Sequence, residues 1–287
     1  MRYQVSHITR YSYEAPVSSC HSELRLAPRV TPHQKVWRRS VSVRPKPERI
    51  DEREDYFGNI VHRFALFDSH SSLEVHSESI VEVQARPLPL PRSTASWEQV
   101  RDAVRAARSG SLFEAIEFTG ESPFAVGAVE IELYARDSLA PGRSLLDAVL
   151  ELNARIHRDF KYKPSSTTID TTPSEVFKTR RGVCQDFAHL MIAMLRPVGI
   201  PVRYVSGYLR SGASYTGAEA SHAWVSVFVP EAGWVDLDPT NNVVPEQGHV
   251  TVAWGRDYGD VTPVKGVTLG GGEQKIDVEV RVIPATS

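Results

Sequence analysis

The hydrophobic pattern of this 287-residue chain changes its period at a proline-rich segment, residues 86–94. Before that segment, apolar and polar residues alternate, and alternation with period two is typical of antiparallel strands. The alternating runs are 2–8, 36–43, 60–66 and 73–83. Within the segment, prolines at every second position favour an extended chain and indicate a boundary. We therefore predict a β-rich domain of sandwich type at residues 1–92, followed by a second domain at 93–287.

The second domain mixes helical and strand patterns, which predicts an α+β fold. Apolar residues recur at helical spacing in 97–108, 145–160 and 184–196. Strand-like runs follow at 202–209, 222–229, 233–238, 250–254 and 276–283. The glycine run 270–272 has neither the lysine nor the helix start of a phosphate loop, so we interpret it as a flexible joint. We expect the helix at 184–196 to pack against an antiparallel sheet.

Charge and hydropathy exclude several classes of protein. The chain carries 33 basic and 35 acidic residues, a formal net charge of -2, so no overall cationic field attracts nucleic acid or anionic lipid. Residues 1–10 lack the run of about 7–15 apolar residues that a secretory signal contains. No stretch approaches the ~18 continuous apolar residues of a membrane span. We expect a cytoplasmic protein that binds neither nucleic acid nor membrane.

The two cysteines, Cys20 and Cys184, have different surroundings. No C-x-x-C pair or His/Cys cluster of zinc-binding spacing accompanies them, so we expect neither a disulfide framework nor a metal site. Cys184 begins the predicted helix, where the helix dipole and unpaired N–H groups favour thiolate over thiol. Taken alone, Cys184 is as consistent with a small buried side chain as with a nucleophile. Cys20 has no such surroundings and is expected to be inert.

Two further residues could complete a nucleophilic site. His222 begins a predicted strand, and Asp238 ends the next strand before Pro239. Taken singly, His222 is more typical of a hydrogen-bonded structural histidine, and Asp238 of an Asp-Pro turn. With Cys184 they supply a nucleophile, a base and a group that orients the base. Asp236 is an alternative to Asp238, because residues two apart lie on the same face of a strand.

Three strings carry a resemblance to a known family. They are Arg-Gly-Val-Cys-Gln-Asp-Phe-Ala-His at 181–189, Ser-His-Ala-Trp-Val at 221–225 and Trp-Val-Asp-Leu-Asp-Pro-Thr-Asn at 234–241. The strings resemble the core motifs of the bacterial transglutaminase-like family, a branch of the papain-like cysteine enzymes. Asp-Tyr-Phe-Gly-Asn at 55–59 is similar to part of the N-terminal region that accompanies this core. The resemblance implies a papain-like core after a β-rich domain, with Cys184 as nucleophile, His222 as base and Asp238 as the orienting carboxylate.

The resemblance also implies amide chemistry through an acyl-thioester on Cys184, with a peptide or protein amide as substrate and no cofactor. Hydrolysis is favoured over transfer to an amine, because transfer needs a tunnel that excludes water and only Trp224 and Trp234 lie near the motifs as walls. The alternative to an enzyme is a non-catalytic peptide-binding module. The backbone N–H of Cys184 is the expected oxyanion donor, and Tyr162 is either a second donor or a structural aromatic.

Two polar residues of the first motif are expected to have supporting roles. Asp186 lies in the first turn of the predicted helix and complements the positive end of its dipole. His189 follows Cys184 by five positions, which places it about 140° around the helix from the cysteine. Such a position makes His189 a poor base for Cys184.

Overall fold

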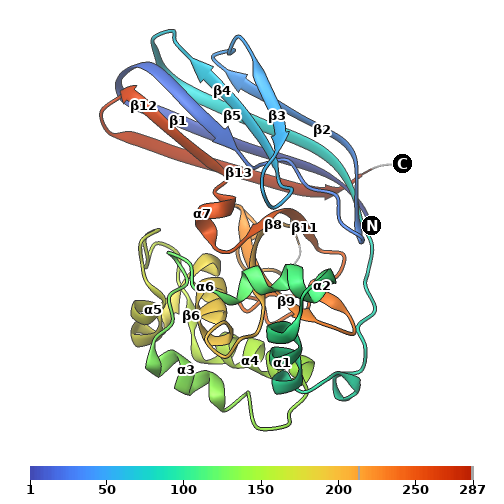
Figure 1. The fold of residues 1–287 in the computed structure, drawn as a ribbon. Coiled ribbons are helices and arrows are strands. Elements are labelled where there is room, and N and C mark those ends of the chain that lie inside the picture. The colour runs from blue at the N-terminus through green and yellow to red at the C-terminus, as the bar shows by residue number, and fades with distance from the viewer. Residues whose placement is uncertain (213, 286–287) are drawn as a thin grey trace.

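The computed structural model describes residues 1–212 and 214–285, and it consists of two parts (Figure 1). A large antiparallel sheet forms the first part, and a smaller sheet surrounded by helices forms the second. The α+β class predicted from the sequence is therefore confirmed.

The large sheet is built around one long strand, β1 (Arg2–Leu24). The first half of β1 pairs with β5 (His70–Val83), which pairs in turn with β2 (Gln34–Arg44). The second half pairs with β4 (Ile60–Leu66), and β4 pairs with β3 (Ile50–Glu54). One strand thus belongs to two groups of strands.

The two groups face each other because β1 changes register in its middle. The shift falls between Ser12 and Val17, next to Pro16, whose missing N–H interrupts a strand ladder. Val75 from one group and Phe64 from the other then pack in the same apolar cluster. The predicted sandwich is therefore a single sheet folded over on itself.

Two C-terminal strands complete this sheet. β13 (Gln274–Pro284) pairs with the first half of β1, and β12 (Val264–Gly270) pairs with the second half. The last two strands of the predicted domain 93–287 therefore belong to the sheet of the first part. β1 has backbone N–H and C=O groups along its second edge, and these groups form hydrogen bonds with the returning C-terminal strands. The glycine run 270–272, predicted to be a flexible joint, has φ values of 92°, 95° and 63° and forms the turn between the two strands.

The smaller sheet forms the centre of the second part. Its strands lie in the order β10 (Gly233–Leu237), β9 (His222–Val229), β8 (Val202–Leu209) and β11 (His249–Gly255). Helix α6 (Cys184–Leu195) packs against β9 and β8. Every residue of β8 and β9 is buried, as expected for strands that are mostly apolar. Both strands have the bounds that the sequence predicts, and α6 ends one residue before the predicted limit.

Helices α1 (Trp97–Ala106) and α4 (Leu145–Asp159) confirm the other two predicted helices. Each begins after a serine cap, Ser96 or Ser144, whose hydroxyl accepts a backbone N–H of the first turn. The remaining elements are η1 (Pro91–Ser93), α2 (Gly110–Ala115), η2 (Ile116–Thr119), α3 (Val129–Arg136), β6 (Lys161–Tyr162), α5 (Pro173–Thr179), β7 (Arg181–Gly182) and α7 (Tyr258–Val261). None of the helices in the described ranges has the length and apolar character needed to cross a membrane.

Two amide side chains join the two parts along β11. Gln34 donates to the carbonyl of Thr251 (2.6 Å) and accepts from its N–H (2.8 Å). Asn59 makes the same pair of bonds to the carbonyl (2.8 Å) and N–H (2.9 Å) of Trp254. Each amide therefore takes the place of a neighbouring strand for one residue of β11. These bonds fix the position of β11 and of the residues that it carries.

Gly207 in β8 is predicted to tolerate no side chain. A Cβ at this position would overlap the carbonyl oxygen of Val250 and the indole of Trp224, both of them fixed in the core. We expect Gly207→Ala to lower the free energy of unfolding by about 2–3 kcal/mol, which is typical of overpacking a close-packed core. Thermal unfolding followed by circular dichroism checks this. Gly120→Ala is the matched control, because nothing lies within 4 Å of a Cβ there, and an equal loss in both variants would contradict the prediction.

Candidate active site

Cys184, His222 and Asp238 lie at the ends of three neighbouring elements. Cys184 is the first residue of α6, His222 is the first residue of β9, and Asp238 directly follows β10. Because β9 contacts both α6 and β10, the three residues come together at one end of the sheet. His222 and Asp238 are buried, with 1% and 0% of their surface exposed, whereas Cys184 is half-buried. The cysteine is thus the member of the group that solvent can reach.

The imidazole of His222 uses its two nitrogens differently. Nε2 forms a hydrogen bond with Oδ2 of Asp238 at 2.9 Å. Nδ1 is buried and has no hydrogen-bond partner among residues 1–212 and 214–285. Cys184 lies beside the ring, close enough to affect its proton affinity. Cys184, His222 and Asp238 thus lie side by side in that order.

The carboxylate of Asp238 is held by an unusually complete set of donors. Oδ1 accepts the backbone N–H groups of Thr240 (2.9 Å) and Asn241 (3.2 Å). Oδ2 interacts with the side-chain amide of Asn241 (2.8 Å) and with Nε2 of His249 (3.1 Å), in addition to His222. Burial acts to raise the pKa of Asp238, but His222 and His249 outweigh it and hold the pKa well below its usual value. Asp238 is therefore ionised at neutral pH.

The pKa of His222 is raised, which favours its protonated form. Burial alone lowers it, but Cys184 and the carboxylate of Asp238 raise it to about 10. The protonated imidazolium is therefore the favoured form of His222 at neutral pH.

Gly217 leaves open the space in front of Nδ1 of His222. A Cβ on this glycine would lie 3.1 Å from Nδ1 and 3.5 Å from the hydroxyl of Tyr162, and its φ of +87° also favours glycine. Burial raises the pKa of Tyr162, with Cys184 and Glu219 adding to the effect, so the phenol keeps its proton. Tyr162 therefore places a hydrogen-bond donor near the cysteine and the imidazole.

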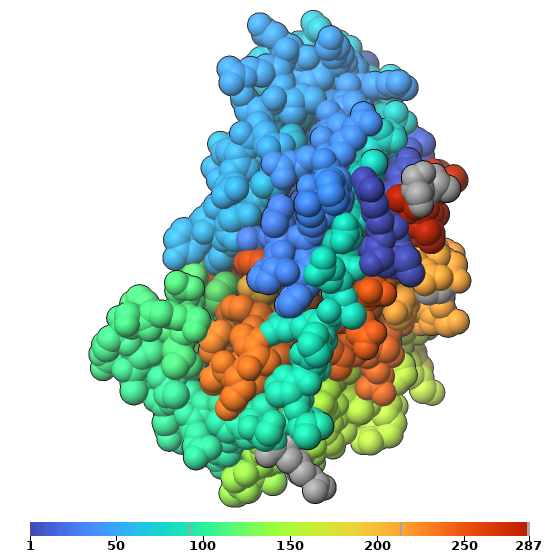
Figure 2. Space-filling view, turned by 90° about the vertical axis from the view of Figure 1, so that its right-hand side faces the viewer, coloured from blue at the N-terminus to red at the C-terminus, as the bar shows by residue number. Residues whose placement is uncertain are grey.

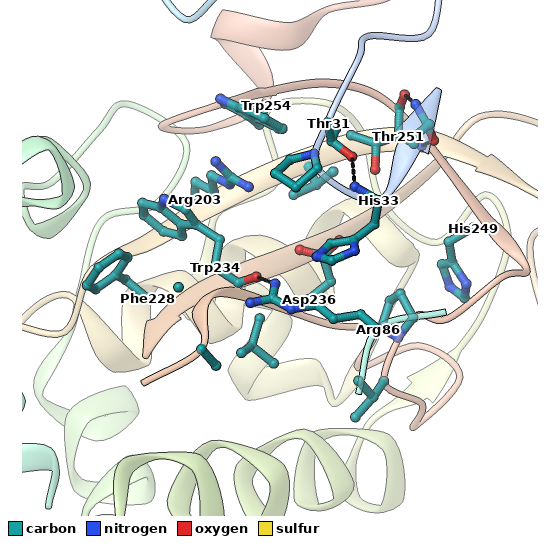
Figure 3. Close-up of a pocket in the computed structure, with 18 of the residues that line it drawn as sticks. Thr31, His33, Arg86, Arg203, Phe228, Trp234, Asp236, His249, Thr251 and Trp254 are labelled. Carbon is teal, nitrogen blue, oxygen red and sulfur yellow. Dashed lines mark hydrogen bonds between the residues drawn. The ribbon is translucent and has the colours of Figure 1, made fainter. Parts of the chain in front are cut away.

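Asp236 is separated from this group. Its Oδ2 accepts the indole N–H of Trp224 (3.2 Å), and the carboxylate lines a cavity together with Arg86 and Trp234 (Figure 3). Asp236 and Asp238 bond different residues of β9, Trp224 and His222, and β10 ends at residue 237, directly before Asp238. The structure thus distinguishes the two carboxylates, which the strand pattern alone does not.

The other polar residues of the first motif stabilise α6. Asp186 accepts the N–H of Val183 and the hydroxyl of Thr167, each at 2.7 Å, and so caps the helix. His189 is buried, accepts the N–H of Tyr258 (3.2 Å), and has a pKa lowered by burial to about 4. His189 is therefore neutral. Both residues support the fold as predicted from the sequence.

Cys20 lies far from this group in the chain, in the second half of β1. It is fully buried in the apolar cluster of the folded sheet, and burial raises the pKa of its thiol. These surroundings agree with the expectation that Cys20 is unreactive.

Sequence reasoning missed two residues of the site, His249 and Asn241. Asn241 lies in the third motif string, but only the folded turn shows that its amide bonds both Asp238 and the carbonyl of Thr216. His249 is brought in by the pairing of β11 with β8. Nitrogens of His222 and His249 and an oxygen of Asp238 lie within 4.8 Å of one another, a spacing that could suit a metal ion. Both Nε2 atoms lie at hydrogen-bond distance from the same carboxylate oxygen, and His222 favours its protonated form, so the cluster fits a proton-bearing network better than a ligand set.

This constellation on a helix and an antiparallel sheet defines a protein of the papain-like cysteine-enzyme type, and comparison with known proteins agrees. The model of the bacterial transglutaminase-like N-terminal region matches residues 3–82, and that of the transglutaminase-like superfamily matches residues 133–239. The chain belongs to the transglutaminase-like superfamily and carries the N-terminal region of its bacterial members.

Three similar proteins illustrate the relationship. An uncharacterized protein of Mycobacterium tuberculosis is 37% identical over 99% of this chain and 93% of its own length. A protein-glutamine gamma-glutamyltransferase of Pseudomonas aeruginosa is 39% identical over 32% of this chain and 15% of its own length. A solved structure from Cytophaga hutchinsonii, described as a "Putative Cysteine Protease", superposes with a TM-score of 0.75 at 21% identity, covering 100% of this chain and 92% of that one. The last likeness confirms the fold along the whole chain.

Proposed function

We propose that this protein is a cysteine-dependent amide or peptide hydrolase with Cys184, His222 and Asp238 as its triad. The observation that carries the proposal is the buried imidazole of His222, held between Asp238 and Cys184 with its pKa raised to about 10. Such an imidazolium stabilises a thiolate beside it, and the thiolate is the nucleophilic form of cysteine. A non-catalytic peptide-binding module has no need of this arrangement.

The reaction would proceed in two steps. The Cys184 sulfur attacks the amide carbonyl and forms a carbon–sulfur bond, while the oxyanion is stabilised by the backbone N–H of Cys184 at the start of α6. His222 then gives its proton to the leaving nitrogen as the carbon–nitrogen bond breaks. In the second step His222 takes a proton from water, the new carbon–oxygen bond forms, and the thioester breaks. Tyr162, whose phenol keeps its proton, would donate a second hydrogen bond to the oxyanion.

The positions of two tryptophans that could form the walls of a tunnel support water as the acyl acceptor. Transfer to an amine requires the amine to outcompete water at about 55 M, which calls for an enclosed tunnel at the thioester. Trp224, one candidate wall, is fully buried and bonds Asp236. Trp234, the other, lines the cavity that contains Asp236. Transfer to an amine remains the second candidate, because one relative is a protein-glutamine gamma-glutamyltransferase.

Incubation of the protein with a glutamine-containing peptide, with and without a primary amine, separates the functions. We expect mass spectrometry to show the free acid as the main product under both conditions. Preferential incorporation of the amine would replace the hydrolase proposal by the transferase. If neither the free acid nor the amine adduct forms, and alkylation of Cys184 is no faster than that of Cys20, a non-catalytic binding module is favoured. Cys20 is the internal control, because it is fully buried.

A further inference from the structure

A large cavity lies between the two parts of the molecule, next to the candidate triad, and His249, which bonds Asp238, is one of its lining residues. Its volume is about 830 Å³, within the range of small-molecule sites, and Cys184 does not line it. In Figure 2 four segments far apart in the sequence meet around this region: residues 31–57, the linker from residue 84, the helical segment 111–118, and β10. We call this cavity the Arg203 pocket, after the residue that distinguishes it.

Arg203 is a buried cation without a polar partner. Only 9% of its surface is exposed, yet its Nε has no hydrogen-bond partner and its guanidinium forms no ion pair with any residue in the described ranges. Arg196, an equally buried arginine, shows what a structural guanidinium looks like. It donates to the carbonyls of Val202, Gly120 and Arg256 and to the hydroxyl of Ser122. Arg203 has nothing comparable, and an unpaired buried charge is costly.

Aromatic rings hold the guanidinium of Arg203 in place. Its central carbon lies 4.4 Å from the ring centre of Trp234 and 3.6 Å from that of Trp254. Arg29 lies 3.2 Å from the same Trp254 centre, and two guanidinium groups cannot share one face at these distances, so the indole lies between them. Stacking fixes the plane of Arg203 and leaves its edge N–H groups for an acceptor. Figure 3 shows Arg203 beside Trp234 and Trp254 at the cavity.

Glu114, Glu117 and Glu246 also line the cavity, but the charges that act on Arg203 itself favour an anion there. Burial lowers the pKa of Arg203 to about 9, although Asp236 acts to raise it, while Arg29 and Arg86 lower it further. Arg86 donates to the backbone carbonyl of Trp234 and also lines the cavity. Arg203 therefore has two guanidinium groups and one carboxylate, Asp236, acting on it, and an incoming anion would offset the excess positive charge at this residue.

We propose that the Arg203 pocket binds a small-molecule carboxylate with an apolar, aromatic body. The planar fork of a guanidinium matches a carboxylate through two parallel hydrogen bonds. The rings of Phe228, Trp234 and Phe118 line the cavity and provide the surface for the apolar body. The pocket adjoins the site proposed for catalysis at His249, but Cys184, His222 and Asp238 do not line it, and the proposal does not depend on catalysis.

Isothermal titration with 4-phenylbutyrate tests the proposal against two matched probes, 4-phenylbutanamide and inorganic phosphate. We expect the acid to bind on the order of 10- to 100-fold more tightly than the neutral amide, the usual effect of a charge-assisted hydrogen-bonded pair. Phosphate should bind more weakly than the acid, because it lacks an apolar body. Equal binding of acid and amide, equal binding of acid and phosphate, or no binding of the acid would each overturn the proposal.

Variants locate the binding. Arg203→Met should lose the preference for acid over amide, while Arg203→Lys should retain part of it. Arg101→Met is the matched control, because Arg101 also lies over a tryptophan, Trp97, but outside the pocket. If Arg203→Met fails to fold, the comparison of the probes on the unaltered protein decides alone. Cys184→Ala should bind the acid unchanged, and loss of binding in that variant would place the acid in the candidate active site and overturn the proposal.

Discussion

Replacement of Cys184 by alanine is expected to reduce amide turnover by on the order of 10⁴–10⁶-fold, because without the sulfur no acyl-enzyme can form. The fold should change little, since Cys184 is half-buried and α6 is anchored by its apolar residues in the core. The measurement is product release from the peptide that the unaltered protein cleaves, with circular dichroism to confirm folding.

Cys20→Ala is the matched control for that experiment. Cys20 is the other thiol of the chain, and it lies in the apolar cluster of the folded sheet. Its removal should cost stability through a small cavity but leave turnover unchanged. Full activity of the Cys184→Ala protein, or equal loss in the two variants, would eliminate Cys184 as the nucleophile.

The elements that carry the site could be predicted from the sequence because burial makes their patterns simple. β8 and β9 are buried on both faces and are therefore mostly apolar between turn signals, with few polar residues. Cys184 is recognisable as a helix start because the apolar stripe of α6 begins next to it. In each case the local sequence was sufficient to predict the element.

The elements that were missed depend on distant partners. β12 is mostly exposed and has no clear apolar face, so only its pairing with β1 makes it a strand. β1 continues past Pro16 to Leu24 because two groups of strands hold it on either side of the register shift. Propensity is a weak guide wherever tertiary pairing decides the conformation.

The residues of the candidate site also differ in whether local sequence or a distant partner determines their position. His222 and Asp238 could be identified because each lies at the end of a predicted strand in a recognisable string. His249 could not, because the strand that carries it reaches Asp238 only through its pairing with β8 and its bonds to Gln34 and Asn59. The Arg203 pocket is similarly invisible in the sequence, since residues from both parts of the molecule line it.

Asp238→Asn is expected to lower kcat by on the order of 10²–10⁴-fold, as loss of the third member does in other triads. The carboxylate raises the pKa of His222, so a neutral amide in its place should lower that pKa and weaken the imidazolium. Asp236→Asn is the matched control, because Asp236 bonds Trp224 rather than His222. Comparable loss of kcat in both variants would contradict the assignment of Asp238.

The pH dependence gives this prediction a readout that a merely structural role would not change. A histidine whose pKa is raised from 6.5 to about 10 in the folded state contributes stability that is complete below pH 6.5 and is lost as the pH rises toward 10. In the proposed mechanism the charged imidazolium also stabilises a thiolate beside it within that window. In Asp238→Asn the pKa of His222 should fall. The contribution of His222 to stability and its effect on the reactivity of Cys184 should therefore both be lost at a lower pH than in the unaltered protein. We therefore expect alkylation of Cys184 by iodoacetamide at pH 6–7 to become markedly slower in Asp238→Asn and to stay unchanged in Asp236→Asn. An unaltered pH profile in Asp238→Asn would show that the carboxylate does not act through His222.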